Sequence, residues 1–128
     1  MTAAPSDTEL LAAADAAAAR AYAPYSNFHV GCVVLARDGR LIEGVNVENA
    51  AYPLGVCAER TALSRAVAEG YRPGDFAVAA ITASPCGGCR QWLHEMEVGR
   101  VVFRNGGSVV TMTTDELLPE SFDSSKLG

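Results

Sequence analysis

The chain has 128 residues, which is enough for one domain with a sizeable core but too few for two. With 49% hydrophobic and 20% charged residues it has the composition of a globular protein, and its net charge of −5 argues against a broad phosphate-binding surface. No apolar run approaches the roughly 18 residues that a membrane span needs, and the opening MTAAPSDTEL lacks the basic and apolar regions of a signal peptide. We therefore expect a cytoplasmic, reducing setting and no nucleic-acid or membrane partner. In such a setting close cysteines bind metal or act in catalysis more often than they form disulfides.

The first half of the chain predicts one helix and one hairpin. Ser6 and Glu9 form a capping-box pattern at the start of an alanine-rich helix over residues 7–21. Two apolar stretches within residues 29–49 meet at Asp38-Gly39, a dipeptide typical of tight hairpin turns.

The second half predicts two longer helices, three strands and a short final helix. Residues 56–70 keep helical spacing up to a glycine stop, and residues 76–83 are apolar on both faces, as in a central strand. A third helix begins after Pro85. Residues 105–107, Asn-Gly-Gly, form the turn of a second hairpin, and Thr114 is the expected cap of the short helix.

This order, α-β-β-α-β-α-β-β, predicts an α/β fold. We expect a three-layer α/β/α sandwich in which a five-stranded mixed sheet is covered by helices on both faces. The last two strands should be antiparallel, because so short a turn cannot make a parallel crossover. We expect a single domain over residues 1–128, since there are no repeats or linkers.

Three cysteines and one glutamate lie at the starts of two predicted helices. CAER places Cys57 and Glu59 at one start, and PCGGC places Cys86 and Cys89 at the other. Helix N-termini favour thiolates over thiols. Three thiolates leave the fourth position of a zinc ion open for water, as in catalytic sites. Glu59 is placed to shuttle the protons of that water.

A Cys-x-x-Cys pair by itself also fits a disulfide, a redox pair or a closed structural metal site. A redox pair needs no distant third cysteine followed two residues later by glutamate. A closed site needs a fourth ligand. Cys32 lies in an apolar strand pattern and should be a buried thiol, His29 opens a strand, and His94 should lie on the exposed side of its helix. We therefore expect an open site.

CAER followed by SPCGGCRQ resembles the zinc-dependent cytidine deaminases, specifically the small homotetrameric type with three cysteine ligands. The resemblance runs from YAPYSNFHVG through GVNVENAAYPLGVCAER and SPCGGCRQ to DELLPESF. It implies a cytidine deaminase-like fold and the hydrolytic deamination of cytidine and 2′-deoxycytidine to the uridine nucleosides, a step of pyrimidine salvage. A zinc-activated water would attack C4 of the base while Glu59 delivers protons to N3 and the leaving amine.

The resemblance also implies roles for individual residues. One Zn²⁺ per chain would be held by Cys57, Cys86 and Cys89. Arg60 would donate to the thiolates and offset their charge, and Gln91 would lie just behind the ligands. The implied substrate-binding residues are Phe28 against the pyrimidine ring, Asn46 and Glu48 on the ribose, Ala58, and Tyr52 and Phe122 reaching into a neighbouring subunit's site. The residues by themselves also allow a core aromatic at Phe28, a solvated strand face at Asn46 and Glu48, and a surface charge at Arg60.

The sequence departs from the family pattern near the cysteines. Several residues are missing between FAVAAITA and SPCGGC, HEMEVGRVV is shortened, and Cys32 stands where a small residue such as alanine is usual. A deaminase of a modified cytosine nucleoside, such as a blasticidin-type antibiotic, is therefore an alternative. A zinc-stabilised binding module without turnover is another, although such a module has no use for Glu59.

Overall fold

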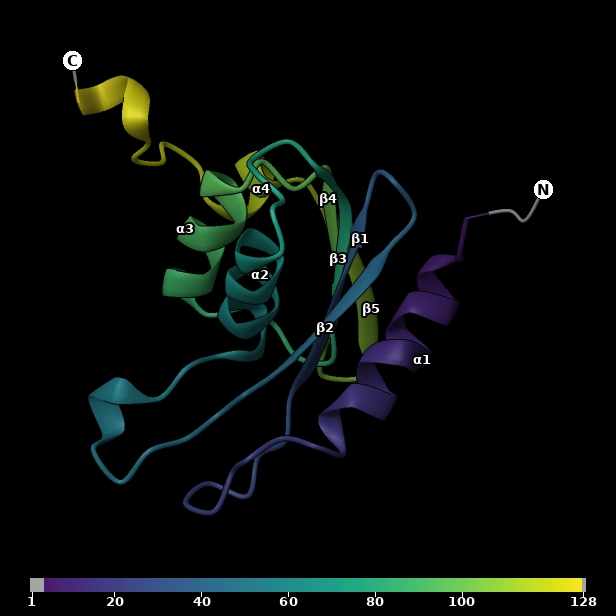
Figure 1. Cartoon of the computed structure of the whole chain (residues 1–128), viewed down its shortest axis with the longest axis vertical. Coiled ribbons are helices and arrows are strands. Elements are labelled where there is room, and N and C mark those ends of the chain that lie inside the picture. Colours follow the sequence, from purple (N-terminus) through teal and green to yellow (C-terminus); the bar gives the residue numbers. More distant parts are fainter. Residues whose placement is uncertain (1–3, 128) are drawn as a thin grey trace.

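A five-stranded mixed sheet forms the middle layer of the part of the chain that the computed structural model describes, residues 4–127 (Figure 1). Its strand order is β2-β1-β3-β4-β5. Neighbouring strands are antiparallel except for β3 and β4, which run parallel. The strands are β1 (Gly31–Ala36), β2 (Leu41–Val45), β3 (Phe76–Ile81), β4 (Arg100–Asn105) and β5 (Ser108–Met112). The antiparallel final pair and the central place of residues 76–81 were both predicted.

Helices cover both faces of the sheet, which confirms the predicted three-layer arrangement. Helix α1 (Asp7–Ala18) lies on one face, and α2 (Ala58–Ala68) and α3 (Gly87–Glu95) lie on the other (Figure 1). The short elements are η1 (Tyr52–Leu54), α4 (Thr114–Leu117) and η2 (Ser124–Leu127). Among residues 4–127, the helices are all too short or too polar to cross a membrane.

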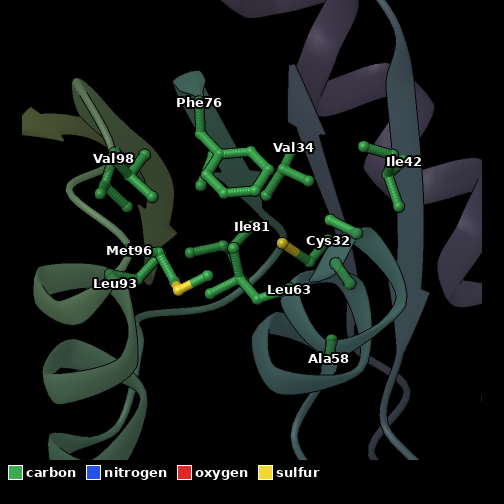
Figure 2. Packing of buried hydrophobic residues seen from close by; sticks show 14 of the residues in the cluster. Cys32, Val34, Ile42, Ala58, Leu63, Phe76, Ile81, Leu93, Met96 and Val98 are labelled. Carbon is green, nitrogen blue, oxygen red and sulfur yellow. The ribbon is translucent and has the colours of Figure 1, made fainter. Parts of the chain in front are cut away.

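The strand residues separate into two apolar layers because successive side chains point to opposite faces. Val33 and Leu35 of β1 pack with α1, whereas Cys32 and Val34 face α2 and α3. In Figure 2, Cys32 lies among the buried side chains of this second layer. Its side chain is inaccessible to solvent, as the sequence predicted.

Helix α2 packs unusually close to β2. A Cβ atom at Gly44 would lie 2.4 Å from both the Ala58 carbonyl oxygen and the Ala62 backbone nitrogen. Only glycine allows this approach. The contact sets the depth at which the N-terminus of α2, and therefore Cys57 and Glu59, sits against the sheet.

Several element boundaries differ from the sequence prediction, for example α2, which spans Ala58–Ala68 rather than residues 56–70, and two of the differences are instructive. The Ser6–Glu9 capping box is present, with hydrogen bonds of 3.0 and 3.2 Å, but α1 ends at Ala18 rather than at residue 21. Beyond it, Tyr22 forms a parallel bridge with Val47, so this stretch follows the neighbouring loop.

The second difference is the cap of the last helix. Thr113, not Thr114, caps α4, because Thr113 has Glu116 three residues later and the two form a reciprocal capping box.

Candidate functional site

Three cysteine thiols meet where the first turns of α2 and α3 lie side by side. Cys57 and Cys86 are the N-cap residues of these helices, and Cys89 lies in the first turn of α3. Their sulfur atoms all lie within 4.8 Å of one another, and those of Cys57 and Cys86 are 3.9 Å apart. Tetrahedral zinc with Zn–S bonds of about 2.3 Å holds its sulfur ligands about 3.8 Å apart. The three thiols therefore fit one zinc ion.

The surroundings of Cys86 and Cys89 shift the pKa values of their thiols in opposite directions. Burial by itself raises the pKa of Cys86, but hydrogen bonds from the Cys89 backbone and from the thiols of Cys89 and Cys57 bring it below its ordinary value. Burial and the nearby negative charge of Glu59 raise the pKa of Cys89. A bound dication favours the thiolate form of all its cysteine ligands, so metal binding would release protons.

Arg60 places a positive charge beside this cluster. Its Nη2 donates to the sulfur of Cys57 over 3.4 Å, and this bond is the main reason that its pKa is raised. A guanidinium at this distance offsets part of the negative charge that three thiolates would bring together.

Glu59 is the one charged side chain among the described residues that is buried, with 3% of its surface exposed. Burial raises the pKa of its carboxyl group. Hydrogen bonds from its own backbone N–H and from the Cys89 thiol, together with the charge of Arg60, only partly oppose this effect. A carboxyl group with a raised pKa beside a metal site is suited to both accepting and returning a proton.

Cys57, Cys86 and Glu59 line one side of a hollow of about 210 Å³. Phe28 stands at its rim with 61% of its surface exposed. The complete lining is Phe28, Val30, Asn46, Cys57, Ala58, Glu59, Ile81, Ala83, Ser84 and Cys86. Much of this wall is apolar, and its polar groups are Asn46, Ser84, Glu59 and the two cysteines. The hollow therefore combines apolar surface with two of the three clustered thiols and a buried carboxyl group.

Residues 82–85 join the end of β3 to Cys86, in the region that we expected to be shorter than the family pattern. Ala83 and Ser84 of this connection line the hollow directly. No role was predicted for these two residues or for Val30 and Ile81, which also line the hollow. Ser84 is the first residue of the SPCGGCRQ motif, so its place in that motif was a signal that it could lie at the site. No feature of the sequence marked Val30, Ile81 or Ala83 as lining residues.

Asn46 and Glu48 lie on the same segment but face different hollows. Asn46 lines the cysteine hollow, where its side chain accepts from Val30 N and donates to Phe28 O, each over 2.8 Å. Glu48 lines an adjoining hollow of about 300 Å³ together with Tyr25, Ser26, Asn49, Tyr52 and Gly55. Glu48 also accepts the backbone N–H groups of Tyr25 and Ser26, so both Asn46 and Glu48 brace the loop that carries Phe28.

Tyr52, Phe122 and Gln91 lie outside the cysteine hollow. Tyr52 is 75% exposed and Phe122 58% exposed, so both aromatic rings are presented to solvent. Gln91 donates through Nε2 to the Phe122 carbonyl oxygen over 2.8 Å, and so holds the C-terminal segment against α3.

His94 is not on an exposed face, so that prediction was wrong. Its imidazole Nε2 lies 3.0 Å from Ser121 Oγ and 3.4 Å from Asp123 Oδ2, and only 14% of the side chain is exposed. The C-terminal segment covers it, a long-range contact that helical spacing does not reveal.

Known proteins with similar sequences and similar folds support a zinc site at these cysteines. Residues 4–105 match the family model of the cytidine and deoxycytidylate deaminase zinc-binding region. The chain belongs to the zinc-dependent cytidine deaminase family. The cytidine deaminase of Halalkalibacterium halodurans is 43% identical over 111 residues, which cover 80% of this chain and 83% of that protein. That of Sporosarcina psychrophila is 40% identical over an alignment of length 128, and the alignment covers 93% of this chain and 93% of that protein.

Solved structures of cytidine deaminases share the fold. The crystal structure from Burkholderia pseudomallei has a TM-score of 0.87 and 45% identity, and the match covers 92% of this chain and 100% of that one. The structure from Mycobacterium leprae has a TM-score of 0.74 and 42% identity, covering 87% and 95%. As a member of the cytidine deaminase family with a matching trio of thiols, the chain is a zinc-dependent hydrolytic deaminase with Zn²⁺ as its cofactor.

Proposed function

We propose that this chain hydrolyses cytidine and 2′-deoxycytidine to uridine and 2′-deoxyuridine with release of ammonia. The observation that carries the proposal is the shared hollow, in which Glu59, two of the three clustered cysteines and Phe28 face the same space. The alternative, deamination of an antibiotic-type cytosine nucleoside, is not favoured by the relatives described above, which are cytidine deaminases.

Cys57, Cys86 and Cys89 would hold the metal. When bound, Zn²⁺ supplies a Lewis acid that lowers the pKa of a water molecule toward neutrality. With three protein ligands, one coordination position stays open for that water. Arg60, through its hydrogen bond to Cys57, limits the negative charge of the cluster.

Glu59 carries the protons of the reaction. Its carboxylate accepts a proton from the water whose oxygen bonds to C4, and returns that proton to N3 of the ring. It then accepts the remaining proton of the added hydroxyl group and passes it to the exocyclic amine. The C4–N bond breaks, ammonia leaves and the C4 carbonyl of uracil forms. The buried position of Glu59 keeps bulk water away from this exchange.

The rest of the hollow suits a free pyrimidine nucleoside. Phe28 offers a ring face to the base, Ala58 gives a small wall beside it, and Asn46 adds a polar side chain to the same hollow, while Glu48 lines the separate hollow around Tyr52. At about 210 Å³ the hollow is smaller than the roughly 300–1,000 Å³ typical of sites for drug-sized ligands. The net charge of −5 also disfavours a polynucleotide track.

We further propose that the enzyme is a cytoplasmic homotetramer that acts in pyrimidine salvage, with Tyr52 and Phe122 contributing to neighbouring sites. Both rings are exposed in the isolated chain, and large exposed aromatics are unfavourable unless a partner covers them. Gln91 supports this arrangement indirectly, because it holds the backbone of Phe122.

The decisive experiment compares ammonia release by the zinc-loaded protein from four compounds: cytidine, 2′-deoxycytidine, a blasticidin-type nucleoside and a short cytosine-containing single strand. We expect turnover of the first two and little of the others. Turnover confined to the antibiotic would overturn the substrate assignment. Turnover of none of them by the zinc-loaded protein would overturn the proposed function.

A further inference from the structure

Ser26 connects the loop that carries Phe28 to Glu48. The Ser26 hydroxyl donates to Oε2 of Glu48, and its oxygen accepts the backbone N–H of Phe28 over 3.0 Å. One hydroxyl group can donate once while accepting, so both bonds exist together. We call this chain of bonds, from Phe28 N through Ser26 Oγ to Glu48 Oε2, the Ser26 relay.

The other oxygen of Glu48 holds the preceding turn. Its Oε1 accepts the backbone N–H groups of Tyr25 and Ser26 over 3.0 and 3.1 Å. Hydrogen bonds from Ser26, its hydroxyl group first, keep the pKa of the Glu48 carboxyl group below its ordinary value. The carboxylate is therefore a charged acceptor, which makes stronger hydrogen bonds than a neutral group.

The loop needs this support because its backbone is sharply turned and exposed. Asn27 has a φ of +58°, in the left-handed region that most residues avoid. Residues 24–29 are all exposed, so apolar packing does little to hold them. On the far side of Phe28, Asn46 bonds Phe28 O and Val30 N. Phe28 is thus held by its N–H through Ser26 and by its carbonyl through Asn46.

We propose that Ser26 is a positioning residue for nucleoside binding: through the relay it holds the Phe28 ring at the rim of the cysteine hollow and orients the Glu48 carboxylate. This inference rests on the proposed function. Ser26 itself does not line that hollow, and its effect passes through Phe28 and Glu48.

The same turn also reaches the surface around Tyr52. The ring of Tyr25 packs edge-on against Tyr52, with centroids 5.9 Å apart. The backbone N–H of Tyr25 is bonded to Oε1 of Glu48, so the Glu48 carboxylate holds the Tyr25–Tyr52 pair with one oxygen and, through Ser26, Phe28 with the other. A loop ordered in advance loses less conformational freedom when ligand binds, which increases affinity.

The first test separates binding from turnover. Ser26→Ala should raise KM for cytidine and the dissociation constant for uridine by about tenfold, since the loss of preorganisation weakens binding. We expect kcat to change by less than about threefold, because Glu59 and the thiols are untouched. Ser26→Thr keeps the hydroxyl group and should restore both constants, because the exposed position has room for the methyl group. Ser108→Ala, an exposed serine on β5, is the matched control.

The second test asks whether Ser26 acts through Glu48. In a Glu48→Ala background the relay has no acceptor, so adding Ser26→Ala should change the uridine dissociation constant by less than about twofold. In the wild type, the Phe28 amide hydrogen should exchange more slowly than in Ser26→Ala. Additive effects of the two substitutions, or an unchanged KM and uridine affinity in Ser26→Ala, would overturn the inference.

Failure of this inference can be told apart from failure of the proposed function. An active wild type with an unaffected Ser26→Ala variant rejects only the positioning role. A zinc-loaded wild type that releases no ammonia rejects the function, while uridine binding and exchange of the Phe28 amide still decide whether the Ser26 relay positions the loop.

Discussion

The sulfur atoms of Cys57 and Cys86 lie 3.9 Å apart although each belongs to the start of a different helix. Neither residue uses its side chain to cap its helix. Both thiols are thus free to bind a cation where the first turns of the two helices meet. The pairing of α2 with α3 on one face of the sheet makes the metal site, and it leads to the first prediction.

Purified protein should contain one zinc ion per chain, and Cys86→Ser should lose it. Cys32→Ala should keep it, because Cys32 lies in the core and alanine leaves no unpaired polar group there. Elemental analysis of both variants checks this. Loss of zinc from Cys32→Ala as complete as from Cys86→Ser would mean that Cys32 is a fourth ligand and the site is closed.

Glu59→Gln should keep the shape of the site and its zinc but remove the proton acceptor. We expect kcat for cytidine to fall by at least the roughly 10²–10⁴-fold that general acid–base catalysis contributes. Steady-state kinetics and zinc content of the same preparation provide the measurement. If the variant retains substantial turnover, another residue moves the protons.

Gly44→Ala should destabilise the fold, because a methyl group would meet the backbone of α2 at Ala58 and Ala62. Overpacking of this kind costs about 1–3 kcal/mol of unfolding free energy. The matched control is Gly107→Ala, where an added Cβ meets nothing within 4 Å. Thermal melting of the two variants tests the difference, and equal melting temperatures would contradict the close approach.

Phe122→Ala should raise KM for cytidine and leave zinc content intact if the ring closes a neighbour's pocket. We expect no direct effect on the metal, because the Phe122 ring is exposed in the isolated chain and lies far along the sequence from the cysteines. Sedimentation of the wild type should show a tetramer alongside these kinetics. A fully active monomer in which Phe122→Ala changes nothing would remove the shared-site proposal without affecting the zinc chemistry.

Local patterns in the sequence were enough to predict much of this protein. The Ser6–Glu9 capping box, the Asp38-Gly39 turn and the apolar run of β3 each depend on residues within a few positions of one another. The trio of cysteines could be predicted for a similar reason. CAER and SPCGGCRQ are short motifs, and each sets its own cysteines at the start of a helix, although only the packing of α2 beside α3 brings the two motifs together.

Structural features that depend on contacts between distant segments could not be predicted from local patterns. After α1 ends at Ala18, Tyr22 pairs with Val47, and the C-terminal segment covers His94. Asn46 and Glu48 were predicted from the resemblance as ribose contacts, but their bonds to the loop of residues 25–30 became visible only in the structure. The sequence by itself determined the elements and the zinc-binding motif, because local hydrogen bonds and side-chain periodicity specify them. The tertiary structure decided which loop each polar side chain braces, because those partners are brought together only when the sheet and its helices pack.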